Sequence, residues 1–545
     1  MKVLKFGGTS VAGSLNIRLV RNIVRKTDAD KMIIVVSALG GVTDKLLVAT
    51  GMAAAQNEDY KTILGEIERR HFTVIKELID IKTQSKVLSS VKSELNTLET
   101  LLEGAFLIGE ATFKLSNKIV SFGELLSSYI ISEFFLQEGL DAAHVDSRTL
   151  IKTYDSDGKA KVNFELTNAN CKSGFSAVKN KIIVMAGVIA SAENGNATTL
   201  GRGGSDYTAA IVAAAIGAEV LEIWTDVSGM FTANPRLVKQ ARAIPHISYE
   251  EAMELSHFGA KVLYAPTIQP VLSKNIDIKI KNTFTPEAEG TLITKSNDEK
   301  GKTVRGISHI GNIALLSLEG PGMVGIPGTS KRFFEVLSQA GISAILITQA
   351  SSEYSICVGI SADDIIRAVA LVNSAFAYEI ERGKIKPVVA EKDLSIIALV
   401  GDNMKSHQGL SGKMFSTLGR NNVNIRVIAQ GASERNISAV IAKSDVKKAL
   451  NALHEEFFEE NIKQLNLFVM GVGNVGSKFL KQVYQQKKYL KDNLKLNIRV
   501  IGMSNSRKMV FDEDGLSLKN WEEKLVTGEK ANRDKFMSRV KELNY

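Results

Sequence analysis

The sequence predicts an α/β protein with a mostly parallel sheet, followed by two copies of a smaller module and a short third region. Through residues 1–295, apolar strand-like segments alternate with helical patterns, as in parallel strands joined by crossover helices. Glycine-rich turns follow several of these strands, and such sheets bind ligands outside the carboxyl ends of their strands. After residue 306 a strand–helix–strand–strand (βαββ) pattern occurs twice, which indicates a duplicated module.

The expected strands of the first region are short and apolar, at residues 1–6, 31–37, 181–187, 220–225 and 276–280, the last one closing the series. Helical patterns cover residues 124–137 and the alanine-rich stretch 206–216. An apolar stripe also recurs at helical spacing through Leu88, Val91, Leu95, Leu98 and Leu102. Because the stripe is short, it predicts one helix packed on this domain rather than a coiled-coil partner face.

The two copies of the module share their landmarks. The first copy has expected strands at 313–318, 344–348 and 355–360 with a helix at 330–340, and the second has strands at 394–400, 424–428 and 437–441 with a helix at 411–420, followed by a helical stretch at 443–460. ITQASSEYSI (347–356) matches IAQGASERNI (428–437), so Gln349 and Gln430 follow an apolar strand at equivalent points. Their amides can donate and accept, which suits an amino-acid ligand, although both could simply cap strand ends. The polar stretch 297–306 predicts a linker.

The third region begins with an apolar strand at 466–470, followed by GVGNVG (471–476), a helix through Tyr484 and a strand at 496–502. Gly471, Gly473 and Gly476 in this context are a moderate signal for dinucleotide binding. No Asp or Glu ends the second strand, so NADP would be accepted at least as well as NAD. The chain ends about 75 residues past the motif, and we therefore expect no complete dehydrogenase in these residues.

Composition excludes several classes of protein. The 545 residues are 44% hydrophobic and 23% charged, as in ordinary globular proteins, and two cysteines are too few for a disulfide framework. The net charge of +9 is spread thinly with only two Trp, so a nucleic-acid partner is not expected. No uninterrupted apolar run is long enough for a membrane span, and MKVLKFGGTS does not resemble a signal peptide. We expect a cytoplasmic protein.

The turn KFGGTS (5–10) follows the first strand. Gly7 and Gly8 would let backbone N–H groups approach a phosphate, and Lys5 would add a positive charge. The motif is not a Walker A loop, since no GxxxxGK[ST] occurs in the chain. An ordinary strand-end turn is the structural alternative.

The turn LGRGGSDYTA (200–209) opens a helix near Asp206, and a helix N-terminus carries partial positive charge and free N–H groups. Arg202 adds a planar donor suited to a carboxylate or a phosphate. Ser205 and Asp206 could also act only as helix caps, but capping and catalysis are compatible. In WTDVSGMFTANPR (224–236), Asp226 could hold a metal or a ribose and Arg236 a phosphate. Lys261, two residues after a glycine, is a weaker candidate.

Six motifs taken in order resemble aspartate kinase of the amino-acid kinase superfamily: KFGGTS, SALGGVTD (37–44), SFGEL (121–125), LGRGGSDYTA, WTDVSGMFT (224–232) and FGAKVL (258–263). The repeated βαββ modules are similar to the paired ACT regulatory domains of that family. The GVGNVG region resembles the start of homoserine dehydrogenase. The whole chain thus resembles the N-terminal two thirds of a bifunctional aspartokinase/homoserine dehydrogenase. The resemblance implies a kinase domain at 1–295, ACT domains at 307–385 and 386–462, and a partial NAD(P)-binding domain at 465–545.

The resemblance also implies roles for individual residues. The transferring phosphate would lie against Lys5, Gly7 and Gly8, and Asp206 would organise the reacting end. The aspartate pocket would comprise Ser37, Thr43, Glu124, Arg202 and Ser205, with Glu124 at the α-ammonium and Arg202 at a carboxylate. ATP would be contacted by Thr225, Asp226, Phe231, Arg236 and Lys261 as well. Three positions depart from the family pattern: Phe231 replaces Tyr, Asn234 replaces Asp, and LYAPT (263–267) replaces a more basic stretch.

The implied reaction is the transfer of the γ-phosphoryl group of Mg-ATP to L-aspartate. The side-chain carboxylate of aspartate, with a pKa of about 3.9, is already ionised at neutral pH and needs no general base. Catalysis would come from positioning and positive charge. Family resemblance makes L-threonine the expected effector and pairing of ACT domains the expected route to a homo-oligomer. Two alternatives stay open: another carboxylate kinase, such as a glutamate kinase, and an inactive ACT-based amino-acid sensor.

Overall fold

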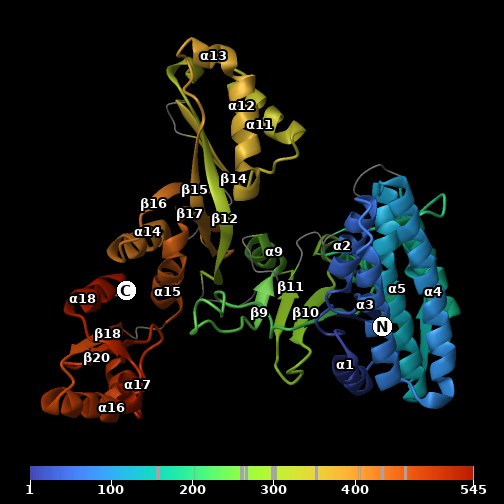
Figure 1. Ribbon diagram of the computed structural model, residues 1–545, viewed down its shortest axis with the longest axis horizontal. Coiled ribbons are helices and arrows are strands. Elements are labelled where there is room, and N and C mark those ends of the chain that lie inside the picture. The colour runs from blue at the N-terminus through green and yellow to red at the C-terminus, as the bar shows by residue number, and fades with distance from the viewer. Residues whose placement is uncertain are drawn as a thin grey trace.

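The computed structural model is built on four β-sheets within the residues it describes (Figure 1). The described residues are 1–154, 160–201, 203–257, 263, 268–295, 303–349, 354–402, 404, 407–430, 435–459 and 463–543. An eight-stranded sheet with long helices occupies the N-terminal half, a six-stranded sheet carries the repeated modules, and a four-stranded sheet lies near the C-terminus. The N-terminal half also contains a three-stranded sheet, formed by β4 (Lys152–Thr153), β6 (Ile189–Ala192) and β7 (Ala197–Thr199). The linker expected at 297–306 lies mostly outside the described residues.

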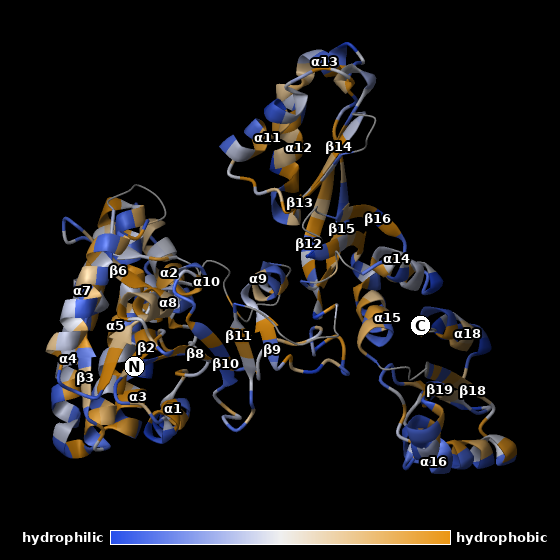
Figure 2. Ribbon diagram, turned by 180° about the vertical axis from the view of Figure 1, so that it is seen from behind, coloured by the Kyte–Doolittle hydropathy of each residue, from blue (hydrophilic) through white to orange (hydrophobic). Residues whose placement is uncertain are grey.

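The eight-stranded sheet is mostly parallel, as predicted. Its order is β3 (Ala142–Val145), β5 (Ile182–Ala186), β2 (Met32–Val36), β1 (Lys2–Phe6), β8 (Val220–Thr225), β10 (Asp277–Asn282), β11 (Thr291–Thr294) and β9 (His246–Ser248). Only the β10–β11 pair is antiparallel. Strands β1, β2 and β5 are almost entirely buried, which fits a sheet covered on both faces, and Figure 2 shows hydrophobic colour on β2.

Helices cover both faces of this sheet. Alternate residues of one strand enter different cores, so that Leu4 packs with α2–α5 and Val3 packs with α7 and α8. The first face carries α1 (Ser14–Lys26), α2 (Val42–Ala54), α3 (Tyr60–Leu78), α4 (Ile81–Ile108) and α5 (Phe113–Gln137). The second carries α7 (Phe164–Ala177), α8 (Gly204–Ile216) and α10 (Ile268–Leu272), while the short α6 (Ser147–Leu150) lies beside β6.

The apolar stripe at Leu88–Leu102 lies on α4 and faces the domain core, which confirms the prediction of a single packed helix. The helix predicted at 124–137 begins earlier, at Phe113, because Thr112 caps it by accepting a hydrogen bond from the Leu115 N–H at 3.2 Å. By length and hydropathy α5 could cross a membrane, but 78% of its apolar window is buried inside the protein, as in a core helix.

The prediction that residues 276–280 close the sheet is wrong. Gly290, with φ of +77°, turns the chain back so that β11 pairs with β10, and β9 then pairs with β11. A Cβ atom at Gly290 would lie 2.0 Å from the Ile280 carbonyl oxygen, so only glycine allows this close return. The sequence around the turn carries no strand pattern that would have revealed the extra pair.

The repeated modules form one antiparallel sheet in the order β13, β14, β12, β15, β17, β16. The first module comprises β12 (Gly306–Glu319), α11 (Thr329–Gln339), β13 (Leu346–Gln349), β14 (Ser355–Ser361), α12 (Ile365–Ala375) and α13 (Ala377–Glu381). The second comprises β15 (Val389–Val400), α14 (Leu410–Arg420), β16 (Ile425–Gln430), β17 (Asn436–Ala442) and α15 (Val446–Phe458). The duplication is therefore confirmed, and the strands β12 and β15 are longer than predicted because they pair with each other along the centre of the sheet.

The C-terminal region begins with the parallel pair β18 (Lys463–Met470) and β19 (Leu496–Ser504), joined by α16 (Asn474–Leu494). The helix runs past the predicted end at Tyr484, because the residues that follow are good helix formers. Figure 2 shows both hydrophilic and hydrophobic colour along α16. Antiparallel strands β20 (Lys508–Phe511) and β21 (Glu529–Lys530) and helices α17 (Trp521–Val526) and α18 (Arg533–Leu543) complete the region.

Candidate active site

The carboxyl ends of four parallel strands meet at one edge of the eight-stranded sheet. The Gly7 N–H, just after β1, donates to the Trp224 carbonyl of β8 at 3.2 Å. The Ser37 N–H, after β2, donates to the Phe6 carbonyl at 3.1 Å, and the Gly187 N–H, after β5, donates to the Val36 carbonyl at 2.8 Å. These bonds fix the glycine-rich turns beside one another at the edge where such sheets bind ligands.

A buried ion pair lies at this edge. Lys5 Nζ is 2.5 Å from Asp206 Oδ1, and the two side chains are only 9% and 14% exposed. Asp206 belongs to the first turn of α8, whose N-terminal cap is Gly203 with φ of +71°. A Cβ atom at Gly7 would come 3.4 Å from Lys5 Nζ, so glycine keeps the space beside the ammonium open. A positive charge and a helix N-terminus therefore face the same position, as an anionic substrate requires.

Two serines connect the turn after β2 to the start of α8. Ser37 Oγ donates to Ser205 Oγ at 3.0 Å, and Ser127 Oγ of α5 donates to the Ser37 carbonyl at 2.7 Å. A Cβ atom at Gly187 would lie 2.5 Å from Ser205 Cβ, so the close approach of α8 needs a glycine there. Thr43 lies in the first turn of α2 and is half-buried.

Glu124 is the unusual charge of this region. It is 3% exposed, and its Oε2 atom has no hydrogen-bond partner among the described residues. Burial raises the pKa of the Glu124 carboxyl to about 7, although the backbone N–H of Ala38 donates to the carboxylate and opposes the rise. Because Ala38 follows Ser37, this carboxylate lies against the same turn that holds Ser205. A buried carboxylate with one oxygen unpaired is suited to a cationic group of a ligand.

The residues expected at the nucleotide follow β8. Thr225 ends the strand and its Oγ1 donates to Asp226 Oδ1 at 3.2 Å, while Asp226 itself is exposed. Phe231 is half-buried and Arg236 is exposed. The Asn234 side chain accepts from the Arg236 backbone N–H at 3.0 Å and so shapes this loop. Three other predicted features lie outside the described residues: Arg202, Lys261, and residues 264–267 of the stretch that differs from the family pattern.

Sequence reasoning missed two positioning serines. Ser127, three residues after Glu124 on α5, holds the Ser37 carbonyl, and that helical spacing was the available signal. Ser10 is fully buried, and its Oγ lies 3.3 Å from the Trp224 carbonyl and 2.8 Å from Thr283 Oγ1. It ties the glycine turn to the ends of β8 and β10, a contact that no local pattern predicts.

Comparison with known proteins assigns the family. A model of the amino acid kinase family matches residues 1–282, and an ACT domain model matches residues 316–376 and 397–457. Aspartokinase 1 of Arabidopsis thaliana is 30% identical, over 84% of this chain and 80% of its own length. The chain belongs to the amino acid kinase family, among the aspartokinases.

Longer relatives match almost the whole of this chain. They are named bifunctional aspartokinase/homoserine dehydrogenase, from Haemophilus influenzae (38% identity over 96% of this chain) and Arabidopsis thaliana (36% over 99%). The chain spans 64% and 60% of their lengths. Among solved structures, E. coli aspartokinase III in complex with aspartate and ADP superposes with a TM-score of 0.72, at 29% identity, over 84% of this chain and 100% of that one. Its complex with lysine and aspartate has a TM-score of 0.69 and 30% identity over the same shares.

The two glutamines of the ACT domains take equivalent places beside the first helix of each domain. Gln349 lines a cavity of about 370 Å³ together with Thr329 and Ser330 of α11. Gln430 Oε1 accepts from Ser411 Oγ of α14 at 3.0 Å. Each helix begins after a glycine in the left-handed region, Gly328 and Gly409. Each glutamine is thus the last residue of its strand and lies beside a helix N-terminus.

The GVGNVG motif forms the predicted strand–turn–helix. Gly471, with φ of +101°, follows β18, and its N–H donates to the Ser504 carbonyl at the end of β19 at 2.8 Å. Gly473 precedes α16 as its N-terminal cap. A Cβ atom at Gly476 would lie 2.4 Å from the Gly471 carbonyl oxygen, so glycine is required for the close approach of helix and strand. The turn thus has glycines at the points where the chain needs them, a left-handed residue after β18 and the close approach of α16.

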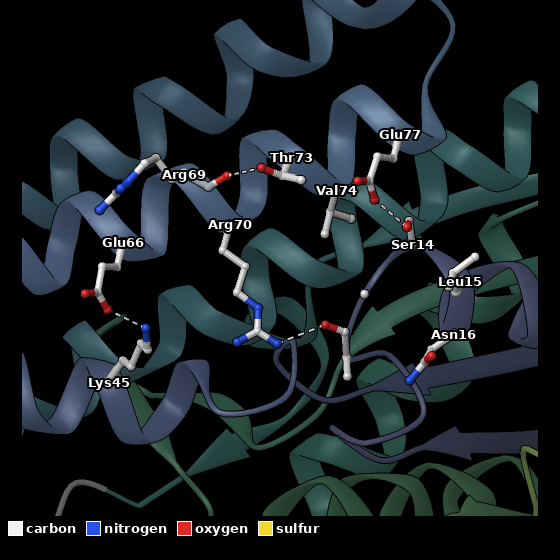
Figure 3. Close-up of a pocket in the computed structure, with 12 residues that line it drawn as sticks. Ser14, Leu15, Asn16, Lys45, Glu66, Arg69, Arg70, Thr73, Val74 and Glu77 are labelled. Atoms are coloured by element: carbon white, nitrogen blue, oxygen red, sulfur yellow. Dashed lines mark hydrogen bonds and ion pairs between the residues drawn. The ribbon is translucent and has the colours of Figure 1, made fainter.

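A second cavity, of about 730 Å³, lies between α1, α2 and α3 (Figure 3). Its charged groups bind one another or the backbone: Lys45 pairs with Glu66 at 2.5 Å, and Arg70 donates to the Ala12 carbonyl at 2.9 Å. Ser14 Oγ donates to Glu77 at 2.5 Å. We assign no ligand to this cavity.

Proposed function

We propose that the chain phosphorylates the side-chain carboxylate of L-aspartate with ATP to give 4-phospho-L-aspartate and ADP. The observation that carries the proposal is the buried carboxylate of Glu124, whose Oε2 atom is unpaired among the described residues. It lies against the turn that holds the Ser37–Ser205 pair, and Ser205 directly precedes Asp206, the partner of Lys5. The Glu124 carboxylate would bind a cationic group and the Lys5 ammonium an anionic one. This pair of groups suits an α-amino acid that carries a further carboxylate.

In this mechanism the aspartate carboxylate attacks the γ-phosphorus of ATP. One carboxylate oxygen forms the new P–O bond as the bond to the β-phosphate oxygen breaks and ADP leaves. Lys5 and the N–H groups at the start of α8 would stabilise the negative charge that the approach of two anions concentrates. Asp206, paired with Lys5 at 2.5 Å, would hold the ammonium at the reacting end. Glu124 would bind the α-ammonium of aspartate, and Arg202 would bind its α-carboxylate.

The nucleotide would lie beyond β8, against Thr225, Asp226, Phe231, Arg236 and Lys261. Gly7 and Gly8 would let the backbone approach its phosphates, because neither residue carries a Cβ atom. Mg²⁺ would enter with ATP and neutralise phosphate charge. Among the described residues, no group of three or more His, Cys, Asp or Glu is placed to hold a metal ion. Mg²⁺ commonly keeps phosphate oxygens and water as most of its ligands, and it would do so here.

The test is coupled ADP release with L-aspartate, with L-glutamate and without an amino acid. Aspartate-dependent release supports the proposal, and release with glutamate alone would identify a different carboxylate kinase. No release with either amino acid, while amino acids still bind, would indicate an inactive sensor.

We further propose that L-threonine regulates the kinase through the cavity that Gln349 lines and its counterpart at Gln430. The proposal is supported by the amides beside two helix N-termini, which suit a zwitterion with a side-chain hydroxyl. The E. coli aspartokinase III complex contains lysine, which makes lysine the rival effector. ACT pairing between chains would give a homo-oligomer, and the cytoplasm remains the expected location.

The region 465–545 is proposed to be the start of an NADP-binding homoserine dehydrogenase domain, after kinase and ACT domains at 1–295, 307–385 and 386–462. The parallel pair β18–β19 with Gly471, Gly473 and Gly476 supports this assignment. The bifunctional names of the longer relatives agree with it. Titration of the chain with NADPH and NADH, followed by cofactor fluorescence, tests both binding and cofactor preference.

A further inference from the structure

The loop that follows the proposed ATP residues of β8 is packed into a different domain. Between Met230 and Ile244, which hydrogen-bond to each other across the base of the loop at 2.7 Å, the chain leaves the kinase sheet. Ala233 and Val238 are then buried in one apolar cluster with residues of the second ACT domain. The ACT members of that cluster include Ile397, Leu399, Met414, Leu418, Leu450 and Leu453. The loop therefore completes the core of the second ACT domain.

Polar contacts join the same loop to one face of α15. Asn451 Nδ2 donates to the Leu237 carbonyl at 3.0 Å, His454 Nε2 lies 2.9 Å from Thr232 Oγ1, and Phe458 accepts from the Arg242 guanidinium through its carbonyl. Positions 451, 454 and 458 are three and four residues apart, so they form one stripe along the helix. Every one of these helix residues thus touches a different point of the loop.

The contact at His454 is the most enclosed of these. His454 is 1% exposed and Thr232 is 7% exposed. The Arg242 backbone N–H donates to Thr232 Oγ1 at 3.1 Å, which leaves the threonine hydroxyl proton free to point at His454 Nε2. Phe458 packs against the imidazole, with ring centroids 5.0 Å apart. Thr232 directly follows Phe231, so this hydrogen bond fixes the backbone next to a proposed ATP contact.

We propose that His454 is a positioning residue for phosphoryl transfer: the second ACT domain, through α15, holds the loop 230–243 in the conformation that binds ATP. The inference rests on the proposed kinase function, since it assigns a role in ATP binding to a side chain outside the kinase domain. The aspartate side has no such dependence, because Ser37, Glu124 and Ser205 are held by α5, α8 and the turn after β2.

The experiment measures KM for ATP and for aspartate, together with the Kd of a fluorescent ATP analogue, in full-length variants. His454→Leu and, independently, Thr232→Val should each raise KM and Kd for the nucleotide at least fivefold while KM for aspartate changes less than twofold. His454→Gln, whose amide can still reach Thr232, should recover most of the nucleotide affinity. The double variant His454→Leu/Thr232→Val should be no worse than either single variant, because both remove the same bond.

Leu418→Ala is the matched control. Leu418 is fully buried in the same apolar cluster but lies on α14 and, among the described residues, forms no hydrogen bond with the loop. Its truncation should therefore lower the melting temperature without changing nucleotide affinity. Unchanged KM and Kd for the nucleotide in Thr232→Val would overturn the inference, and so would an equal loss in Leu418→Ala. If the wild-type chain binds the nucleotide but releases no ADP with aspartate, the proposed function fails, and the Kd comparison still decides the role of His454.

Discussion

Glu124→Gln separates the charge of this side chain from its shape, and it should change stability and aspartate binding in opposite directions. Burial raises the pKa of Glu124 from 4.5 to about 7, against the opposing hydrogen bond from Ala38. At about 1.4 kcal/mol for each pKa unit, the ionised carboxylate costs the folded protein up to about 3 kcal/mol. Because the folded pKa lies above the unfolded value, wild-type stability falls as pH rises from 4.5 to 7 and is level above that window.

Glu124→Gln removes the free-energy cost of burying an ionised carboxylate. Its unfolding free energy without ligand should exceed that of the wild type by as much as about 3 kcal/mol near pH 8, with a smaller gain near pH 5. Thermal and denaturant unfolding at both pH values measure the difference. Glu133→Gln is the control, because Glu133 lies on the same helix but is 20% exposed and pairs with Lys86 at 3.7 Å. It should bring no gain near pH 8.

Aspartate binding should weaken in Glu124→Gln. Losing a hydrogen bond between the α-ammonium and an ionised carboxylate costs about 1.5–3 kcal/mol, or roughly 10- to 150-fold in KM. The wild type must ionise Glu124 to form this contact, so its KM for aspartate should fall as pH rises through about 7, whereas the variant should show no such slope. An unchanged KM, or the same slope in the variant, would refute the role of Glu124.

Other substitutions test the rest of the chain. Lys5→Ala or Asp206→Ala should lower kcat by at least about 100-fold with the fold retained, as measured by ADP release and circular dichroism; near-wild-type turnover would remove both from the reacting end. Gln349→Ala or Gln430→Ala should relieve threonine inhibition and leave uninhibited kcat nearly unchanged, and stronger inhibition of the wild type by lysine would reject threonine as effector. Gly476→Ala should weaken NADPH binding at least about tenfold by cofactor fluorescence, because its Cβ would meet the Gly471 carbonyl at 2.4 Å, and kinase kinetics should not change.

The parts of the fold that the sequence predicted well are those whose signal is local. The strand Val220–Thr225 has the same bounds in prediction and structure, because a buried strand between turn residues is readable from its own composition. The pair β11 and β9 was missed because it depends on the return of the chain at Gly290 against the Ile280 carbonyl, a contact between distant residues. Local patterns also placed the start of α8 within two residues of Asp206.

The same distinction applies to the candidate site. The meeting of Lys5 with Asp206 was predictable. Lys5 on β1 precedes one glycine turn and Asp206 on α8 follows another, and parallel topology brings both turns to one edge. The hydrogen bonds from Ser127 to the Ser37 carbonyl and from Ser10 to the Trp224 carbonyl were not predictable, since nothing in the sequence around a serine identifies its partner. The packing of Val238 into the second ACT domain could not be predicted either. An apolar residue in a loop indicates burial, but the sequence does not indicate which domain it packs against.

The two proposed substrate sites are held in place by different domains. The proposed aspartate pocket is held by β2, α5 and α8, all within the kinase domain. The loop beside the proposed ATP site is held by His454 and the apolar core of the second ACT domain. A change in the packing of α15 should therefore alter the affinity for ATP more than the affinity for aspartate. If threonine inhibits by altering that domain, the inhibition should appear mainly as weaker ATP binding, with KM for aspartate nearly constant. A threonine titration that raised KM for aspartate and left KM for ATP unchanged would contradict this route.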